Sequence, residues 1–518
     1  MGGKSKRCLL PFRRLWCFLA AAALLGGISG AARAEEPQVV SVFINHAWFP
    51  VQDFTGVIPE EITRVTGVTL EITIAQDMQH LSRLIAQNKL PDIVYTSTML
   101  ERMNNPALCY SYDELLEKYD VAWSIPAELR ANALTYSPDG RIYGLLNNYA
   151  SNEDWQHTAA VPMISSLMIR QDILDAMGVE QIRTTDELKE VYLRVKAEYP
   201  HLVPLTFDKT HCFNFFRCCF GLGLLPFQEQ EDGSWLYYAQ DARYLEMLTW
   251  LNELYRAGCM IPDSFAATDG DASVLYKSDR SFSFSGCTQN TNLFLHSELI
   301  QIDESYRSVE LFPLDGACYD TQGLGWSASF ITRNARDPQT CIELLRWMYS
   351  DEGQHLTEWG REGIDYTLDE NGLPVFSADV MQSIASDSYN QTYNPWFYFG
   401  TSAIVEAEGR CALQGDKLSG AAYDEIRQRY RILPWVAAAL AQMPEDYRLI
   451  YDRITASISD YETKIILSAD EAAFQRNVNE MLTYLEALNV ERIEQHMSDS
   501  IPEQYRQYQQ RMKEMGSP

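Results

Sequence analysis

Three short apolar runs follow residue 38: VVSVFI at 39–44, VTLEITI at 68–74 and LPDIVY at 90–95. They are rich in β-branched and aromatic residues, which is typical of strands. A helical pattern near 60–65 separates the first two runs, and apolar residues at helical spacing around 81–85 separate the second from the third. This β-α-β-α-β order predicts an α/β fold with a mainly parallel sheet.

Polar and aromatic residues directly follow two of these predicted strands. Asn45 and Trp48 come after the first strand, and Thr96 and Ser97 come after the third. In open α/β sheets, ligands bind outside the carboxyl ends of the strands. We therefore expect these four residues to contact a ligand.

The rest of the chain also mixes helix and strand signals. Thr184 and Glu187 form a capping-box pattern ahead of an apolar helical stripe, and Asp337-Pro338 is typical of a helix start. Hairpins are predicted at 231–237 and 369–372. Because no internal repeat, low-complexity run or long Pro/Gly-rich segment interrupts the pattern, we predict an α/β protein throughout.

Residues 1–34 have the composition of a secretory signal peptide. A basic start is followed by an apolar run at 15–25 and an A-x-A cleavage pattern at 32–34. The apolar run is too short for a membrane span, which needs about 20 residues. We expect export of the protein to the cell surface, periplasm or medium; an uncleaved N-terminal anchor is the alternative.

The chain of 518 residues carries 42 Lys and Arg against 71 Asp and Glu, a net charge of −29. Loss of the predicted signal peptide removes six basic residues and changes the net charge to −35. An acidic protein of this kind is a poor partner for nucleic acid or for an anionic membrane surface. The length suggests several domains or lobes, at roughly 100–200 residues each.

Nine cysteines remain after the predicted cleavage, so at least one thiol stays outside any intrachain disulfide. His211-Cys212 and Cys218-Cys219 lie close in sequence, but a zinc site would need a second pair of ligands at suitable spacing. The flanking phenylalanines favour buried thiols. We expect neither a metal ion nor a cofactor.

The sequence lacks the common catalytic motifs. It contains no glycine-rich nucleotide loop, no G-x-S-x-G nucleophile elbow and no H-E-x-x-H zinc motif. A glycosidase would need two carboxyl groups about 5–10 Å apart across a cleft, which no motif singles out. A secreted glycoside hydrolase therefore stays open as an alternative.

An ordered set of segments resembles the bacterial extracellular solute-binding proteins of ABC sugar importers, specifically the lipoprotein-type subgroup of family 1. The segments are DGRIYGL (139–145), LMIRQDILDAMG (167–178), TDEL (185–188), LNELYRAG (251–258) and WGREGIDYT (359–367), the last ahead of DENGLP (369–374). Arg141 replaces the usual lysine of the family, and Leu146 stands where proline is common. The lipobox of the subgroup is missing, because Cys8 and Cys17 lack its sequence context.

The resemblance implies a type II periplasmic-binding-protein fold, in which two lobes close like a Venus flytrap about hinge crossovers. The lobes are expected at 38–155 plus 328–366 and at 156–327 plus 367–518. The implied function is capture of a carbohydrate, an oligosaccharide, by cleft closure, and its delivery to the permease subunits of an ABC transporter. No catalytic residues are implied, and we expect a monomer.

Sugar rings present C–H faces to aromatic rings and hydroxyl groups to polar side chains. The predicted aromatic contacts are Trp48, Tyr149, Trp155, Trp326 and Trp396. The predicted polar contacts are Asn45, Thr96, Ser97, Asn147, Asn152 and Asp154. Core packing is the competing explanation for each aromatic residue. Binding of a peptide or another organic solute also stays open, as does a role as a surface sensor subunit.

Overall fold

The computed structural model describes residues 36–47, 49, 52–162, 164–267, 269–287, 298–311, 313–323, 325–386, 388–395, 399–413 and 420–515. The predicted signal peptide at 1–34 and the predicted contacts Trp48 and Trp396 lie outside the described residues. Within these ranges, no helix is both long enough and apolar enough to cross a membrane.

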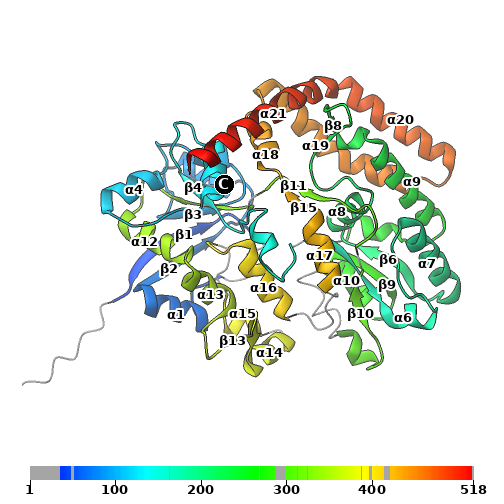
Figure 1. Cartoon of the computed structure of the whole chain (residues 1–518), viewed down its shortest axis with the longest axis horizontal. Helices are drawn as coiled ribbons and strands as arrows, with labels where there is room; N and C mark the ends of the chain where they lie inside the picture. Colours follow the sequence, from blue (N-terminus) through cyan, green and yellow to red (C-terminus); the bar gives the residue numbers. More distant parts are fainter. Residues whose placement is uncertain are drawn as a thin grey trace, which may run out of the picture.

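The first sheet confirms the predicted β-α-β-α-β start of the chain. Its strand order is β2 (Val68–Ile74), β1 (Gln38–Ile44), β3 (Ile93–Thr96), β12 (Ala328–Ile331) and β4 (Gly144–Leu146). β1 runs parallel to both β2 and β3, whereas β12 is antiparallel to β3 and β4. The helices around this sheet are α1 (Val57–Thr66), α2 (His80–Ala86), α3 (Leu100–Met103), α4 (Tyr112–Tyr119), α5 (Ala127–Thr135), α12 (Pro338–Met348) and α13 (Asp351–Trp359). Figure 1 shows this part of the molecule in blue, cyan and olive.

The second sheet has the order β10 (Ser308–Glu310), β5 (Ser165–Arg170), β9 (Ser281–Cys287) and β6 (Val203–Phe207). It lies apart from the first sheet, on the green side of the molecule (Figure 1). Its helices are α6 (Gln171–Ala176), α7 (Thr185–Glu198), α8 (Lys209–Cys219), α9 (Ala242–Arg256) and α10 (Asp269–Lys277). Short elements complete it: β7 (Phe227–Glu229), β8 (Trp235–Tyr237), η2 (Tyr238–Gln240) and η3 (Pro262–Phe265).

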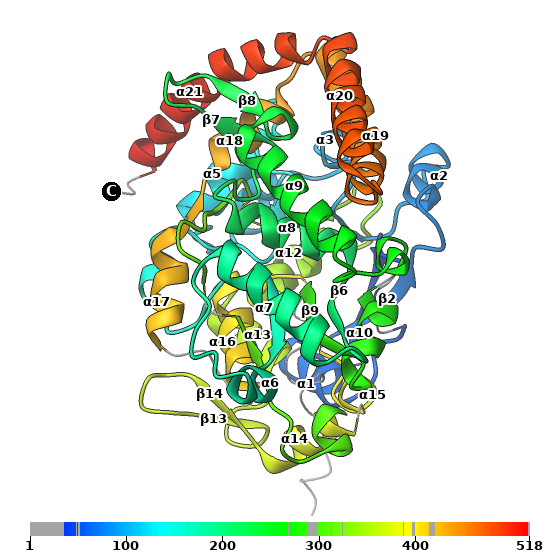
Figure 2. The same cartoon turned by 90° about the vertical axis from the view of Figure 1, so that its right-hand side faces the viewer.

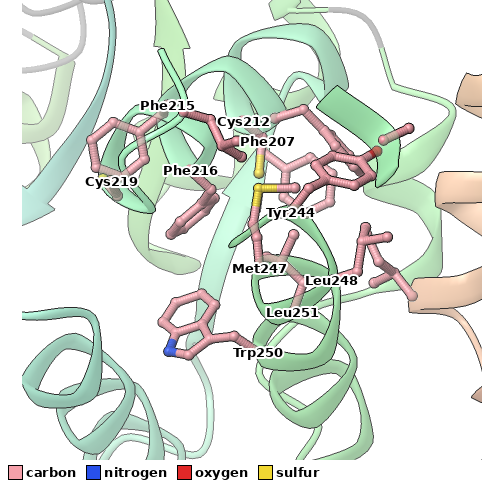
Figure 3. Packing of buried hydrophobic residues seen from close by; sticks show 14 of the residues in the cluster. Phe207, Cys212, Phe215, Phe216, Cys219, Tyr244, Met247, Leu248, Trp250 and Leu251 are labelled. Atoms are coloured by element: carbon pink, nitrogen blue, oxygen red, sulfur yellow. The ribbon is translucent and has the colours of Figure 1, made fainter. Parts of the chain in front are cut away.

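Each sheet is packed in a hydrophobic cluster of its own. In the second cluster, Phe207 of β6 and Phe216 of α8 pack with Tyr244, Leu248 and Trp250 of α9 (Figure 3). The Phe216 and Trp250 rings are 5.0 Å apart. Two separate cores joined by crossing segments are the expected construction of a two-lobed protein.

The chain crosses between the sheets after β4 and again before β12. Here β11 (Tyr319–Thr321) pairs in parallel with β15 (Tyr430–Ile432), a strand from far along the chain. A small third cluster surrounds this pair and includes Trp155, Ala407 and Tyr423. The other elements nearby are η1 (Asp154–Gln156), α16 (Ala403–Leu413) and α17 (Gly420–Arg429).

The segment after residue 366 divides its packing between the two cores. It begins with the predicted hairpin, β13 (Tyr366–Leu368) and β14 (Pro374–Phe376), followed by α14 (Ala378–Ala385) and α15 (Tyr389–Thr392). Val380, Ile384 and Phe399 belong to the hydrophobic cluster of the first sheet. That core therefore continues beyond the expected lobe boundary at 366, because these apolar side chains are buried there rather than against the second sheet.

The C-terminal helices pack mainly on the second core. They are α18 (Pro434–Ala441), α19 (Glu445–Ile466), α20 (Glu471–Ala487) and α21 (Val490–Glu514). α21 extends over the top of the molecule from the second lobe to α5 of the first (Figures 1 and 2). Arg511 Nη1 of α21 donates to Thr135 Oγ1 at 3.4 Å.

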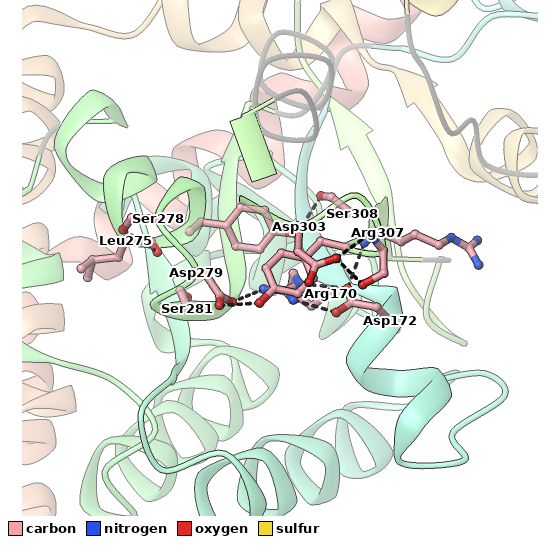
Figure 4. A network of polar contacts seen from close by, with 12 residues as sticks. Arg170, Asp172, Leu275, Ser278, Asp279, Ser281, Asp303, Arg307 and Ser308 are labelled. Atoms are coloured by element: carbon pink, nitrogen blue, oxygen red, sulfur yellow. Dashed lines mark hydrogen bonds and ion pairs between the residues drawn. The ribbon is translucent and has the colours of Figure 1, made fainter. Parts of the chain in front are cut away.

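A buried arginine in the 167–178 segment forms a network of ion pairs. Arg170, at the end of β5, is 2% exposed and donates to both carboxylate oxygens of Asp172, at 2.9 and 2.7 Å. It also forms an ion pair with Asp279, and its guanidinium lies 3.8 Å from the centre of the Tyr306 ring (Figure 4). This network ties β5 to α6 and to the turn before β9, which is a structural role.

Local sequence signals agree with the structure where they are short-range. Glu187 N donates to Thr184 Oγ1 at 3.1 Å, and Thr184 N donates to Glu187 Oε2 at 3.0 Å, which completes the capping box of α7.

Cys212, Cys218 and Cys219 are buried, and burial raises the pKa of the Cys212 thiol well above its usual value. Among the described residues, no three His, Cys, Asp or Glu side chains are grouped as a metal site would require.

Candidate functional site

The carboxyl ends of β1 and β3 bring two predicted site residues together. Asn45 Nδ2 donates to Thr96 Oγ1 at 3.0 Å and to Thr98 Oγ1 at 3.1 Å. The parallel register that pairs Ile44 with Tyr95 places these residues side by side. Asn45 is half-buried, and Thr96 is fully buried, so it is Asn45 that reaches the surface at this edge.

An aromatic group lies at the same edge of the sheet. The His46 ring is 5.0 Å from Trp326 and 5.4 Å from Tyr95, and its Nε2 is 2.9 Å from Ser327 Oγ. Burial lowers the pKa of His46 to about 4, so the imidazole is neutral at pH 7. Trp326 remains 36% exposed. One side of the indole is therefore held by its neighbours while part of its surface remains open.

A cavity of about 180 Å³ lies where the crossovers meet. Its lining is mixed in chemistry and comes from β11, β15, α16 and both crossovers: Asn148, Ala150, Trp155, Thr321, Gly323, Gly325, Trp326, Ala403, Glu406, Ala407, Tyr430 and Ile432. Trp155 and Trp326, both predicted contacts, share this cavity. The Tyr430 ring meets Trp155 edge-on at 5.7 Å.

Close approach of the two crossovers shapes the cavity. A Cβ atom on Gly325 would lie 2.1 Å from the carbonyl oxygen of Asn147, so the position requires glycine. Asn147 N donates to Ser327 O at 2.9 Å, and Ser327 N donates to Asn147 Oδ1 at 3.1 Å. Asn147 thus joins the crossovers. Asn148 follows with φ of 50°, a left-handed conformation that asparagine tolerates better than most residues.

A carboxylate forms the charged part of the wall. Glu406 of α16 is 5% exposed and accepts hydrogen bonds from Asn148 Nδ2 and from Arg410, whose Nε lies 3.0 Å from Oε1. Glu358 of α13 lies close to this pair. Burial and the neighbouring Glu406 raise the pKa of Glu358 well above its usual value, although Arg410 opposes the shift. The structure therefore favours the protonated form of Glu358.

Two other predicted contacts line a second cavity of about 400 Å³ on the first crossover. Tyr149 and Asp154 are among its lining residues, together with Asp351 and Gln354. Tyr149 stacks on Tyr349 with ring centres 5.9 Å apart, and burial raises its pKa to about 12. Predicted contacts on the first crossover thus line two different cavities, Trp155 the first and Tyr149 with Asp154 the second.

Asn152 and Ser97 have different environments. The Asn152 side chain pairs with the backbone of β15: Nδ2 donates to Ile432 O at 3.0 Å, and Oδ1 accepts from Ile432 N at 2.8 Å. Ser97 is half-buried beyond β3. Of the predicted contacts in the described ranges, only Trp155 and Trp326 line the 180 Å³ cavity.

Sequence reasoning missed four residues around this cavity: His46, Asn148, Glu406 and Tyr430. His46 and Asn148 are neighbours of predicted contacts, so their positions at the strand ends were available as a signal. Glu406 and Tyr430 come from segments far along the chain, and no local pattern marks them.

Known proteins were compared with the chain by sequence and by structure. No protein-family model matches the sequence, and no curated protein matches it. Solved structures do match. The alginate-binding protein AlgQ2, without calcium ion, aligns with a TM-score of 0.66 at 15% identity over 90% of this chain and 98% of that chain.

Two further structures have similar scores. An extracellular solute-binding protein from Bifidobacterium longum subsp. infantis has a TM-score of 0.65 at 13% identity, covering 90% of this chain and 98% of that chain. The Streptococcus pneumoniae ABC-transporter substrate-binding protein FusA, in complex with kestose, has a TM-score of 0.64 at 17% identity, covering 90% and 99%. At these identities the likeness establishes the fold alone. The chain has the two-lobed α/β fold of extracellular solute-binding proteins.

Proposed function

We propose that this protein is an extracellular solute-binding protein that captures a carbohydrate between its lobes and delivers it to the permease of an ABC transporter. The observation that carries the proposal is the cavity at the crossovers, where Trp155, Trp326 and Tyr430 meet the polar groups of Asn148 and Glu406. Flat aromatic rings combined with a few fixed polar groups suit the two faces of a sugar.

The proposed mechanism is ligand-driven closure. A sugar that touches both lobes gains contacts only when the lobes approach each other, so binding shifts the population toward the closed form. A permease can then distinguish loaded from empty protein by shape. The function makes and breaks no bond, and we propose that the protein is not an enzyme.

The remaining features of the proposal come from the sequence. The ordered motifs favour the lipoprotein-type subgroup of family 1, and the N-terminal pattern favours export through a cleaved signal peptide. We propose that the protein acts as a monomer, with lobes near the expected boundaries except that Val380, Ile384 and Phe399 join the first lobe. The proposed contacts are Asn45 from that lobe and the exposed part of Trp326 at the second crossover.

The similar structures support a carbohydrate ligand by what their names state. They include alginate-binding AlgQ2, FusA in complex with kestose, and an N-glycan transport solute-binding protein in complex with Man1GlcNAc. These ligands differ from one another in charge and in linkage. The fold therefore favours an oligosaccharide without selecting its type.

Intrinsic fluorescence and calorimetry on a panel of oligosaccharides test the proposal. We expect a saturable change in tryptophan emission with at least one oligosaccharide. Trp326→Ala should weaken binding at least about tenfold, because an aromatic contact is lost. Trp435→Phe, in α18, is the control and should bind normally. Failure of the whole panel to bind would refute the carbohydrate assignment, and hydrolysis products would refute the non-enzymatic role.

A further inference from the structure

The wall of the 180 Å³ cavity has one charged group among its described lining residues, the carboxylate of Glu406. The counterion of Glu406 is Arg410, which forms an ion pair with it. Arg410 directs both Nε and Nη2 to the same oxygen, Glu406 Oε1. Asn148 Nδ2 donates to the other oxygen. No cationic side chain from the described ranges lines the cavity, so a ligand carboxylate would find no counterion in this wall.

A buried hydrogen-bond donor belongs to a residue of the same wall. Trp155 is 2% exposed, and its Nε1 has no hydrogen-bond partner among the described residues. Leaving such a donor without an acceptor in a buried place is unfavourable. A neutral hydroxyl group suits this wall, because it can donate to the Glu406 carboxylate without bringing a second charge.

The volume of the cavity limits how much of a ligand can bind inside it. A cavity of about 150 Å³ accommodates one benzene molecule. The cavity of about 180 Å³ is thus suited to a single six-membered ring. The rings of Trp155, Trp326 and Tyr430 provide its apolar surface, and Glu406, Asn148 and Thr321 provide polar groups. Any further residues of an oligosaccharide would extend outside it.

Building on the proposed function, we propose that this cavity takes one uncharged, terminal sugar residue of the ligand and rejects a uronic acid at that position. A uronate would bring a second carboxylate next to Glu406 inside a partly enclosed cavity, where like charges repel. We also expect an amino sugar to bind weakly at this position. Its ammonium group would compete with Arg410 for Glu406, which would leave a buried guanidinium with fewer partners.

The surroundings reinforce this selectivity. The adjoining 400 Å³ cavity is lined by Glu128, Asp154 and Asp351, which are also acidic. The two cavities share Ala150 in their walls. The fold alone leaves the charge of the ligand open, since the similar AlgQ2 structure is named for alginate, a polyuronate. We infer that the side chains of the cavity wall, rather than the fold, select the charge of the ligand.

Matched pairs of trisaccharides test the inference by calorimetry. Suitable pairs are β-1,4-mannotriose with β-1,4-mannuronate trisaccharide, cellotriose with its glucuronate counterpart, and α-1,4-galactotriose with α-1,4-galacturonate trisaccharide; a broad neutral panel accompanies them. We expect the neutral members alone to bind, with any uronate weaker by at least about 100-fold. A uronate that binds as tightly as a neutral sugar would overturn the inference while leaving carbohydrate capture intact. Absence of all binding would instead refute the proposed function.

Substitutions that change the charge of the cavity wall provide a second test of the inference. Glu406→Gln removes the repelling carboxylate, so uronate affinity should rise at least about tenfold relative to the neutral sugar. Because this leaves Arg410 without its anion, the double variant Glu406→Gln, Arg410→Gln provides a charge-free wall if the single variant folds poorly. Glu408→Gln is the matched control: it lies two residues along α16, where Glu408 accepts from Thr158 Oγ1 at 2.9 Å, and selectivity should not change. Unaltered selectivity in both Glu406 variants would contradict the inference.

Discussion

Asp92, at the start of β3, shows how one carboxylate connects distant parts of the first lobe. It is 3% exposed, and its Oδ2 accepts from Ser41 N at 2.7 Å and from Arg336 Nη2 at 2.8 Å. Its Oδ1 accepts from Arg336 N at 2.7 Å. Burial acts to raise the pKa of Asp92, but the bonds from Arg336 and Ser41 outweigh it and lower the pKa to about 2.

We predict that Asp92→Asn lowers the free energy of unfolding by about 2 kcal/mol at pH 7, because hydrogen bonds to a charged acceptor are lost. The folded-state pKa lies below the unfolded value of about 3.9, so the carboxylate stabilises the fold above pH 4. That advantage disappears as the pH falls through about 2. Urea unfolding of wild type and variant should therefore differ at pH 7 and converge between pH 4 and pH 2.

Asp120→Asn is the control for this prediction. Asp120 is exposed and ends α4 with φ of 52°, a conformation that asparagine also adopts readily. Its free energy of unfolding should stay within about 0.5 kcal/mol of wild type. A difference between wild type and Asp92→Asn that does not change with pH would contradict the electrostatic explanation.

At the level of single residues, the sequence predicted Trp155 and Trp326 as ligand contacts because aromatic residues near expected crossovers suit a sugar site, and both line the 180 Å³ cavity. It did not identify Glu406. Asn148 and Glu406 are 258 positions apart, and only packing of α16 against the first crossover brings them together. Asn152 illustrates the converse: its polar side chain, predicted as a contact, satisfies the backbone of β15.

At the scale of elements, β15 depends on partners from distant segments. Its three residues pair with β11 on one side, and Asn152 of the first crossover binds both backbone groups of Ile432. So short a strand has little stability by itself. The side chain of Asn152 acts as one more strand partner for β15.

We predict that Asn152→Ala increases amide hydrogen exchange at Ile432 and its neighbours, because the two side-chain hydrogen bonds are worth about 1 kcal/mol each. Exchange should rise roughly fivefold or more at Ile432, measured by mass spectrometry or NMR. Glu153→Ala, at the exposed next position, should leave exchange at β15 unchanged. Equal protection of Ile432 in wild type and Asn152→Ala would refute the role assigned to Asn152.

The elements differ in how far sequence predicts them. β1, β2 and β3 were predicted from local alternation, because parallel strands separated by helices carry their signal within about 60 residues. β12 was not predictable as their neighbour. It lies between β3 and β4 in the first sheet, although all the strands of the second sheet stand between β4 and β12 in the sequence.

At the scale of the whole molecule, α21 connects the two lobes. Its middle packs on the second core through Ile493, Met497 and Ile501. Toward its end, Tyr508 contacts Trp435 with ring centres 5.8 Å apart, and Arg511 reaches Thr135 of α5. Figure 2 shows α21 passing over the molecule, with its C-terminal end away from α19 and α20. The helix therefore restrains the first lobe relative to the second.

We predict that the double variant Tyr508→Ala, Arg511→Ala loosens this connection. Amide exchange in α5 should increase, and small-angle scattering without ligand should give a larger radius of gyration. β5 in the second core should keep its exchange protection, because neither side chain packs there. Lys513→Ala, exposed on the last turn of α21, is the control. Unchanged exchange in α5 would show that α21 does not hold the lobes together.

By itself the sequence determined the strand and helix signals, the capping of α7, the α/β class and the resemblance to solute-binding proteins. These rest on short-range patterns: the period of apolar residues, cap residues and turn residues. Only the tertiary structure placed Val380, Ile384 and Phe399 in the core of the first sheet, and it alone joined Trp155, Trp326, Glu406 and Tyr430 around one cavity. The physical reason is that contacts between distant segments depend on how the whole chain buries its apolar surface, which local patterns do not encode.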